Sequence, residues 1–95
     1  MDPISPTNRI RLSSRARIQN DRVTGEPILL YPEGVLILNA TGQAVLSRCG
    51  GNESLGQIIT GLAKSYDVAQ DQISAEVIVF LDRLRALNLL EVDGK

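Results

Sequence analysis

The sequence of 95 residues has no histidine, no tryptophan and a single cysteine, Cys49. One cysteine cannot form an internal disulfide, and so low a count is typical of a chain kept in a reducing compartment. A nucleophilic cysteine needs a neighbouring base, and there is no histidine to act as one. We therefore interpret Cys49 as a small residue buried at the end of a helix.

Catalytic and metal-binding motifs are also missing. The sequence has no glycine-rich phosphate loop and no cysteine and histidine cluster with metal-ligand spacing. Asp67, Asp71 and Glu76 could form a general acid and base pair, but they surround a predicted helix start, where acids cap the helix and offset its dipole. The Gly50-Gly51 step is explained as a helix terminator. We expect no catalytic residue, no metal and no cofactor.

Aromatic residues, net charge and long apolar runs are scarce as well. Three aromatics among 43% hydrophobic residues predict one domain with an aliphatic core. A net charge of -1 gives no global attraction to nucleic acid or to an anionic membrane. No segment approaches the roughly 20 apolar residues of a membrane span, and none resembles a signal peptide, so the expected location is cytoplasmic.

The charge that is present is unevenly distributed. The first 22 residues carry five arginines against two aspartates, a net charge of +3, and the remainder carries -4. This asymmetry either orients an acidic partner or only solvates the N-terminal part. Composition predicts a flexible N-terminal arm over residues 1–8, a single domain over residues 9–92 and a polar tail over residues 93–95.

Three short strands are predicted before the first helix. Residues 9–18 alternate apolar and arginine residues in part, which favours a strand over residues 16–20. A Thr-Gly step and a proline within residues 21–27 indicate a hairpin connection to a second strand at residues 28–31. Pro32 and Gly34 then turn the chain into a third strand at residues 35–38. Short strands joined by tight turns predict an antiparallel meander.

Helical spacing follows the strands. Asn39 is a suitable N-cap for a first helix that we expect to stop at Gly50-Gly51. Ser54 and Gln57 match a capping box that begins a second helix of about 12 residues. After a break at residues 67–69, residues 71–88 predict a third helix whose core stripe consists of Ile73, Val77, Phe80, Leu81, Leu84 and Leu87.

Two aliphatic residues of the third helix lie outside this stripe, on opposite flanks. Ile78 lies near Arg85, and Val79 lies near Glu76 and Arg83. The order of elements predicts an α+β fold that is winged helix-turn-helix-like, with a three-stranded antiparallel sheet followed by three helices.

DNA binding is the obvious function for that outline. A recognition helix should present basic or amide side chains near its N-terminus, with phosphate-binding bases around it. The third helix begins Ala69-Gln70-Asp71-Gln72-Ile73-Ser74-Ala75-Glu76, with two acids and no base, and the second helix offers only Lys64. A DNA-binding regulator therefore stays an alternative hypothesis that lacks the required charge.

The strand Val35-Leu36-Ile37-Leu38 is the feature that folding alone leaves unexplained. An edge strand without charge or proline tends to pair with another chain. Either helices cover both of its faces, or its edge is open and an extended peptide adds to it as a further strand. In the second case Ile78 and the stem of Arg85 would line a groove beside the strand. An open edge could also pair with its own copy in a homodimer.

The run VTGEPILLYPEGVLILNATGQAVLSRCGG, with SLGQIITGLAKSYDV and EVIVFLDRLRALNLLEV behind it, resembles the pyrroloquinoline quinone biosynthesis chaperone D (PqqD) family. The likeness covers residues 10–92 and rests on the order and spacing of several short motifs. Two departures are Gly50-Gly51, where the family often has Asp-Gly, and Gly42, where it usually has a better helix former.

The resemblance implies a non-catalytic chaperone of ribosomally made, modified peptides, which binds the leader of a small precursor peptide. It also implies a partner, a radical S-adenosylmethionine enzyme, to which the peptide is presented. In such domains the leader adds as a strand beside the third strand and packs against the third helix. Carried over to this sequence, the peptide-binding residues are Val35, Leu36, Ile37, Leu38, Ile78, Leu81 and Arg85.

Overall fold

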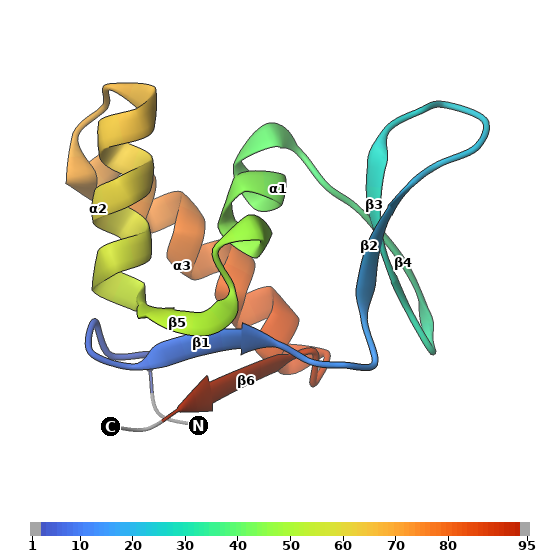
Figure 1. Cartoon of the computed structure of the whole chain (residues 1–95), viewed down its shortest axis with the longest axis horizontal. Helices are drawn as coiled ribbons and strands as arrows, with labels where there is room; N and C mark the ends of the chain where they lie inside the picture. Colours follow the sequence, from blue (N-terminus) through green and yellow to red (C-terminus); the bar gives the residue numbers. More distant parts are fainter. Residues whose placement is uncertain (1–2, 94–95) are drawn as a thin grey trace.

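The computed structural model describes residues 3–93, and these form two three-stranded antiparallel sheets and three helices (Figure 1). The elements in chain order are β1 (Arg9–Leu12), β2 (Arg17–Asn20), β3 (Pro27–Tyr31), β4 (Gly34–Ile37), α1 (Ala40–Ser47), β5 (Gly50–Ser54), α2 (Leu55–Tyr66), α3 (Gln70–Ala86) and β6 (Leu90–Asp93). The predicted α+β class, the meander and the three helices are confirmed. A second sheet was not expected.

The predicted meander is the sheet β2-β3-β4, which we call the meander sheet. Leu29 of β3 lies opposite Leu36 of β4, and both are buried. The β2–β3 turn contains Gly25, whose φ of 76° is unfavourable for residues that carry a Cβ. Figure 1 shows this sheet to one side of the helices, and the chain enters α1 directly from β4.

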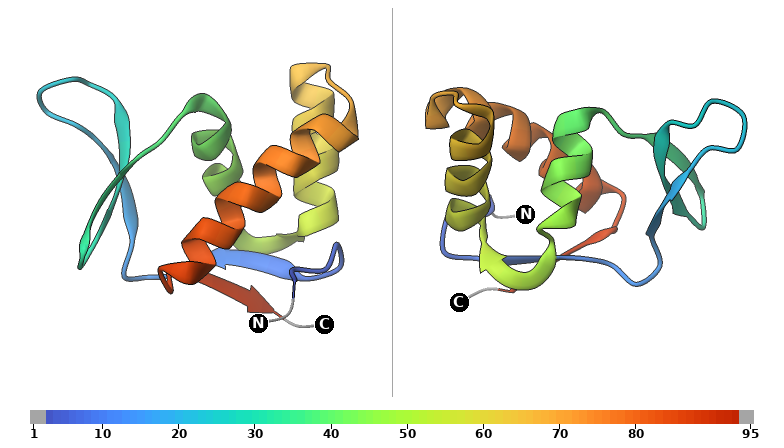
Figure 2. Two further views of the ribbon diagram at one scale, coloured as in Figure 1. Left: turned by 180° about the vertical axis from the view of Figure 1, so that it is seen from behind. Right: turned by 45° about the horizontal axis from the view of Figure 1, so that its top comes forward.

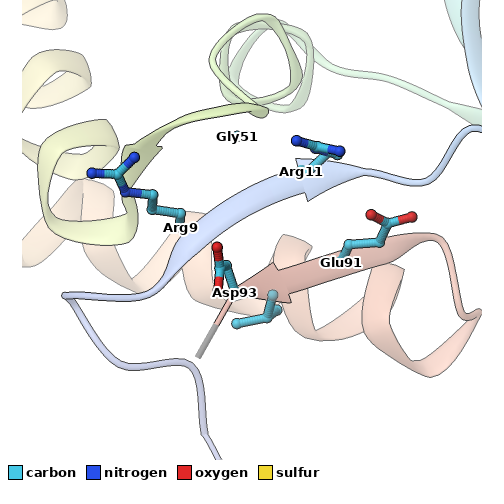
Figure 3. A pocket seen from close by; sticks show the side chains of 6 residues that line it. Arg9, Arg11, Gly51, Glu91 and Asp93 are labelled. Atoms are coloured by element: carbon cyan, nitrogen blue, oxygen red, sulfur yellow. The ribbon is translucent and has the colours of Figure 1, made fainter. Parts of the chain in front are cut away.

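The second sheet has the order β5-β1-β6, and we call it the base sheet because the three helices lie on one side of it (Figures 1 and 2). Along β1 and β6, the apolar residues alternate with charged ones. Ile10 is fully buried against the helices, whereas the arginines and acids lie on the other face (Figure 3). This is the half-buried pattern of an antiparallel sheet with one face in solvent.

The formation of β5 and β6 corrects two predictions. We expected α1 to continue to Gly50-Gly51, but it ends at Ser47 and the two glycines begin β5. Asp93, which we placed in a polar tail, pairs with Arg9 across the base sheet. Four residues with a period of two were too short a signal to separate from a tail.

The alternating run at residues 9–18 contains two strands of different sheets. Ser13 is buried, and its backbone N–H donates to the carbonyl of Leu89 at 2.8 Å. The Ala16 N–H donates to the backbone carbonyl of Ser13 at 3.1 Å, and this bond closes the turn between β1 and β2. The Arg15 guanidinium donates to the carbonyl of Asn88 at 2.6 Å. These bonds tie the crossing between the sheets to the end of α3.

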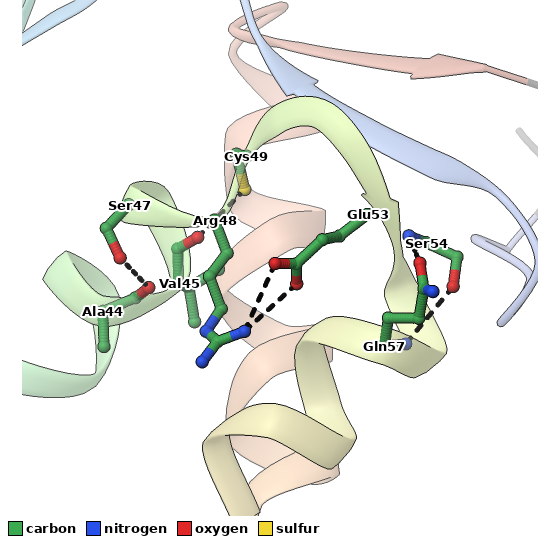
Figure 4. Close-up of polar contacts among 8 residues, drawn as sticks. All are labelled: Ala44, Val45, Ser47, Arg48, Cys49, Glu53, Ser54 and Gln57. Carbon is green, nitrogen blue, oxygen red and sulfur yellow. Dashed lines mark hydrogen bonds and ion pairs between the residues drawn. The ribbon is translucent and has the colours of Figure 1, made fainter. Parts of the chain in front are cut away.

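Both predicted N-caps are confirmed. Asn39 accepts a hydrogen bond from Gly42 N–H at 2.7 Å. Ser54 and Gln57 form a reciprocal capping box at the start of α2, and that helix has the expected 12 residues (Figure 4). Ser54 is also the last residue of β5, so one residue ends the strand and caps the helix.

An aliphatic core lies between the helices and the two sheets. Its fully buried members from the third helix are Val77, Leu81 and Leu84, and the core also takes in Leu29, Leu36 and Leu38 of the meander. Phe80 and Leu87 of the predicted stripe are only partly buried. Within residues 3–93, no helix is long and apolar enough to cross a membrane.

The first described residues are bound to α2 and to the end of β6. Gly56 N–H donates to the carbonyl of Pro6 at 2.9 Å, and the Asn8 amide donates to the carbonyl of Asp93 at 3.1 Å. Residues 3–8 of the predicted arm are therefore attached to the domain by hydrogen bonds. Residues 1–2 of that arm and 94–95 of the predicted tail lie outside the described residues.

Candidate functional site

β4 has an open edge in the part of the chain that the structure describes, because it pairs only with β3. Leu38 N–H, just beyond β4, donates to the carbonyl of Pro27 at 3.0 Å. Backbone donors alternate in direction along a strand, so the N–H groups of Val35 and Ile37 point to the open side. No charged residue lies between Gly34 and Leu38 to protect that edge from pairing.

The two faces of this strand differ sharply in exposure. Leu36 and Leu38 are 7% and 4% exposed and belong to the core. Val35 and Ile37 are 54% and 69% exposed. Burial of the first pair anchors the strand, and the second pair is free to contact a partner. Of the two open interpretations, coverage of both faces by helices is therefore excluded.

Contacts between α1 and α3 show which side of α3 faces α1. A Cβ added to Gly42 of α1 would lie 3.2 Å from the Phe80 ring of α3, so the two helices approach closely there. This close approach gives a physical reason for glycine at a position where a better helix former is usual. Figure 2 shows α1 and α2 on different sides of α3.

A shallow pocket of about 390 Å³ lies between the start of α1 and this flank of α3. Its lining residues come from the segment after β4 and from the middle of α3: Asn39, Thr41, Ala75, Glu76 and Val79. Val79 is 71% exposed and supplies apolar surface, while Glu76 supplies a negative charge. The pocket adjoins the end of β4 because Asn39 directly follows Leu38.

The three predicted α3 residues take different positions around the helix. Successive helix residues are separated by about 100°, so Ile78 lies roughly 160° and Arg85 roughly 140° around the helix from Phe80. Both therefore lie on the side of the helix away from Phe80, whereas Leu81 is fully buried in the core. That these three residues contact a peptide beside β4 stays a prediction.

Val79 lines the pocket beside the start of α1. Arg83 lies about 60° from Phe80 and about 40° from Val79, hence on the flank that carries the pocket. Both residues had been identified as lying outside the core stripe. A helical projection shows two flanks but does not tell which of them faces the start of α1, and the pocket lining shows that it is the flank of Val79.

The single cysteine of the chain, Cys49, is not a reactive thiol. Cys49 is buried, and its thiol lies 3.2 Å from the carbonyl of Val45 (Figure 4). Burial, and secondarily the negative charge of Glu53, raises the pKa of Cys49 from its ordinary value of 9.0 to about 12. The thiol is therefore protonated at neutral pH. Among residues 3–93, no group of His, Cys, Asp and Glu could hold a metal ion.

Comparison with known proteins identifies the family of this chain. Residues 26–90 match the family described as coenzyme PQQ synthesis protein D (PqqD). The chain belongs to the PqqD family. A PqqA binding protein of Xanthomonas axonopodis pv. citri (strain 306) is 36% identical over 92 residues, covering 97% of this chain and 100% of the relative. A PqqA binding protein of Rhizobium meliloti (strain 1021) is 26% identical over 94% of this chain and 91% of its own.

Two solved structures of the family share the fold. The solution structure of the PqqD truncation of Methylobacterium extorquens PqqCD matches with a TM-score of 0.78 and 30% identity, covering 93% of this chain and 94% of that one. It is described as a functional, stand-alone recognition element for ribosomally synthesized and post-translationally modified peptides. PqqD from Xanthomonas campestris matches with a TM-score of 0.59 and 34% identity, over 84% and 89% of the two chains.

The DNA-binding alternative receives no support from these relatives. The structure agrees with the charge argument, since the first turn of α3 carries Asp71 and its basic residues, Arg83 and Arg85, lie in the last turn. A duplex approaching the N-terminal half of α3 would meet acids.

Proposed function

We propose that this chain is a non-catalytic chaperone that binds a PqqA-type precursor peptide and presents it to a radical S-adenosylmethionine enzyme. The peptide adds as a strand to the open edge of β4. The observation that carries the proposal is the pair of outward N–H groups at Val35 and Ile37, which belong to an edge without protecting charge. Relatives named for binding PqqA support the choice of peptide.

Strand addition fits the geometry of the site. An added strand would form backbone hydrogen bonds with β4, and alternate side chains would point to opposite faces of the sheet. Those on the outer face would contact the exposed side chains of Val35 and Ile37. The others would approach the flank of α3 that carries Val79 and Arg83, including the pocket beside Asn39. Backbone bonds supply affinity, and the pocket supplies selectivity.

A titration of the ¹⁵N-labelled chain with a synthetic precursor peptide tests the proposal. We expect the largest amide shifts at Val35 and Ile37 and along the Val79–Arg83 flank of α3. A spectrum that does not change when the peptide is added, or shifts confined to α2, would contradict the proposal.

Replacing Ile37 by proline tests the backbone contact directly. Proline has no N–H to donate, and the donor lost at this position points away from β3, so the β3–β4 ladder keeps its bonds. We expect a loss of peptide affinity of roughly tenfold or more, because a buried acceptor on the peptide loses its partner. The matched control, Ile37→Ala, keeps the N–H and should lose less. A folded Ile37→Pro variant with unchanged affinity would exclude pairing at this residue.

A further inference from the structure

The pocket between the start of α1 and α3 combines an apolar wall with a single carboxylate. Glu76 is the one ionisable residue of its lining, which otherwise consists of Asn39, Thr41, Ala75 and Val79. Ala75, Glu76 and Val79 are all exposed. Ala75 and Val79 are four residues apart on α3, so their side chains are neighbours and form one apolar surface beside Glu76.

Glu76 has no cation of the described chain beside it. Within residues 3–93, the ion pair that forms joins Arg48 and Glu53. The α3 residues one helical turn away from Glu76 are all uncharged: Gln72, Ile73, Val79 and Phe80. Arg83 lies two turns away, about 10 Å along the helix axis. Glu76 therefore presents an uncompensated negative charge to a group that enters the pocket.

The start of α1 offsets this charge only in part. A helix N-terminus carries a partial positive charge because its first N–H groups have no partner within the helix. Asn39 already accepts the hydrogen bond of the Gly42 N–H at 2.7 Å, and α1 is only eight residues long. The full charge of a carboxylate exceeds the partial charge of so short a helix, so the pocket disfavours an acidic side chain and favours a basic one.

Strand addition at β4 directs one peptide side chain toward this pocket. Residues that lie directly opposite each other on paired strands share a face of the sheet. The peptide residue opposite Leu38 therefore lies on the face of Leu36 and Leu38, which packs against the helices. The next residue of the chain, Asn39, already lines the pocket. A lysine or arginine at this peptide position can cover apolar surface with its alkyl stem while its charged end reaches the carboxylate.

We infer that Glu76 selects a lysine or arginine of the bound peptide at the position opposite Leu38. The inference rests on the proposed function, and it adds the chemical class of one peptide residue and the side chain that recognises it. The alkyl stem of that residue packs on Ala75 and Val79, and its cation lies beside the Glu76 carboxylate. Glu76 contributes selectivity, because an ion pair of this kind discriminates between peptides more than it adds affinity.

Paired substitutions in the chain and in the peptide test the inference by isothermal titration calorimetry. The probes are the synthetic precursor peptide and a set of peptides in which each lysine or arginine is replaced singly by glutamine. Glu76→Gln should bind the original peptide roughly fivefold more weakly. One peptide of the set should lose a similar factor with the original chain and lose little more with Glu76→Gln, because the two groups act as a pair.

A charge exchange separates recognition from a structural role of Glu76. Glu76→Lys should repel the peptide cation and weaken binding of the original peptide by roughly tenfold or more. The same variant should recover most of that loss with a peptide that carries glutamate at the identified position. A residue that only supports the fold would show no such rescue.

The matched control is Glu91→Gln, which removes one exposed acid of β6 and leaves the pocket unchanged. Its affinity for the original peptide should stay within about twofold of that of the original chain. In the complex of the original chain, nuclear Overhauser contacts should join the methylenes of the selected peptide residue to the methyl groups of Val79. Such contacts locate the residue at the pocket independently of the affinities.

Two results would overturn the inference and leave the proposed function standing. One is an unchanged affinity of Glu76→Gln for the original peptide. The other is a set of peptides in which no lysine or arginine is coupled to Glu76. A precursor peptide that does not bind the original chain at all would refute the proposed function, and the role of Glu76 would fall with it.

Discussion

At the scale of single residues, Cys49 shows how burial determines chemistry. The sequence contains one cysteine and no histidine, which already made a nucleophile improbable. The structure adds that the side chain is 3% exposed and that the carboxylate of Glu53 acts on it. Both effects disfavour the thiolate, which is the reactive form.

We predict that Cys49 is unreactive in the folded chain. A pKa of about 12 in place of 9.0 lowers the thiolate fraction at pH 8 by roughly a thousandfold. Ellman's reagent should therefore react at least about a hundredfold more slowly with the native chain than with the chain in urea. Equal rates in the two conditions would show that the thiol is accessible.

The same thiol makes stability depend on alkaline pH. The folded chain holds the Cys49 proton more tightly than the unfolded chain, so the free energy of unfolding should fall as the pH rises from about 9 to about 12. Other groups also titrate in this range, and the Cys49→Ala variant isolates the contribution. Urea unfolding curves at several pH values should show a steeper loss for the original chain than for the variant.

At the scale of elements, the end of α2 is a local feature with an energetic cost. The expected break at residues 67–69 is confirmed, and the cap residue Asp67 adopts the left-handed conformation with φ 55° and ψ 49°. Val68 N–H then donates to the carbonyl of Ala63 at 3.0 Å. Glycine adopts this backbone conformation without the steric penalty of a Cβ.

Asp67→Gly should therefore stabilise the chain. We expect a gain of about 0.5–1 kcal/mol in the free energy of unfolding, measured with urea. Asp71→Gly is the matched control: Asp71 lies in the first turn of α3, where an acid favours the helix dipole, and this change should cost about 1 kcal/mol. A loss of stability on Asp67→Gly would mean that the carboxylate outweighs the strain.

The third helix shows the limit of reasoning from one element. Its period identified the buried stripe, because burial depends on spacing along the helix. It did not identify the flank that faces the start of α1, which is the flank of Val79. The packing of α1 on α3, with Gly42 close to Phe80, decides this.

At the scale of the whole molecule, the base sheet joins both ends of the chain. β1 lies between β5 and β6, so it pairs with a segment about forty residues away and with another about eighty residues away along the chain. Leu12 N–H also donates to the carbonyl of Cys49 at 3.0 Å. The helices rest on a surface that exists only when these three distant segments meet.

Truncation after Leu89 should consequently destabilise the entire domain. It removes the strand pairing of β6 and uncovers apolar surface under Leu90 and Val92, which pack against the core. We expect the free energy of unfolding to fall by roughly 2 kcal/mol or more. A chain that ends at Asp93 is the control. If both chains unfold at the same urea concentration, the C-terminal residues act only as a tail.

The sequence by itself determined the features whose cause is local. Asn39, Ser54 and Gln57 marked two helix starts through the backbone donors that they satisfy, and residues 28–38 marked a hairpin with an unprotected strand. Tertiary structure decided what depends on distant partners. Gly50–Ser54 has no strand pattern of its own and becomes β5 by pairing with β1. Packing of α1 likewise decides which flank of α3 lies beside the start of α1. Such pairings arise from contacts across the fold, which a periodicity along one segment does not contain.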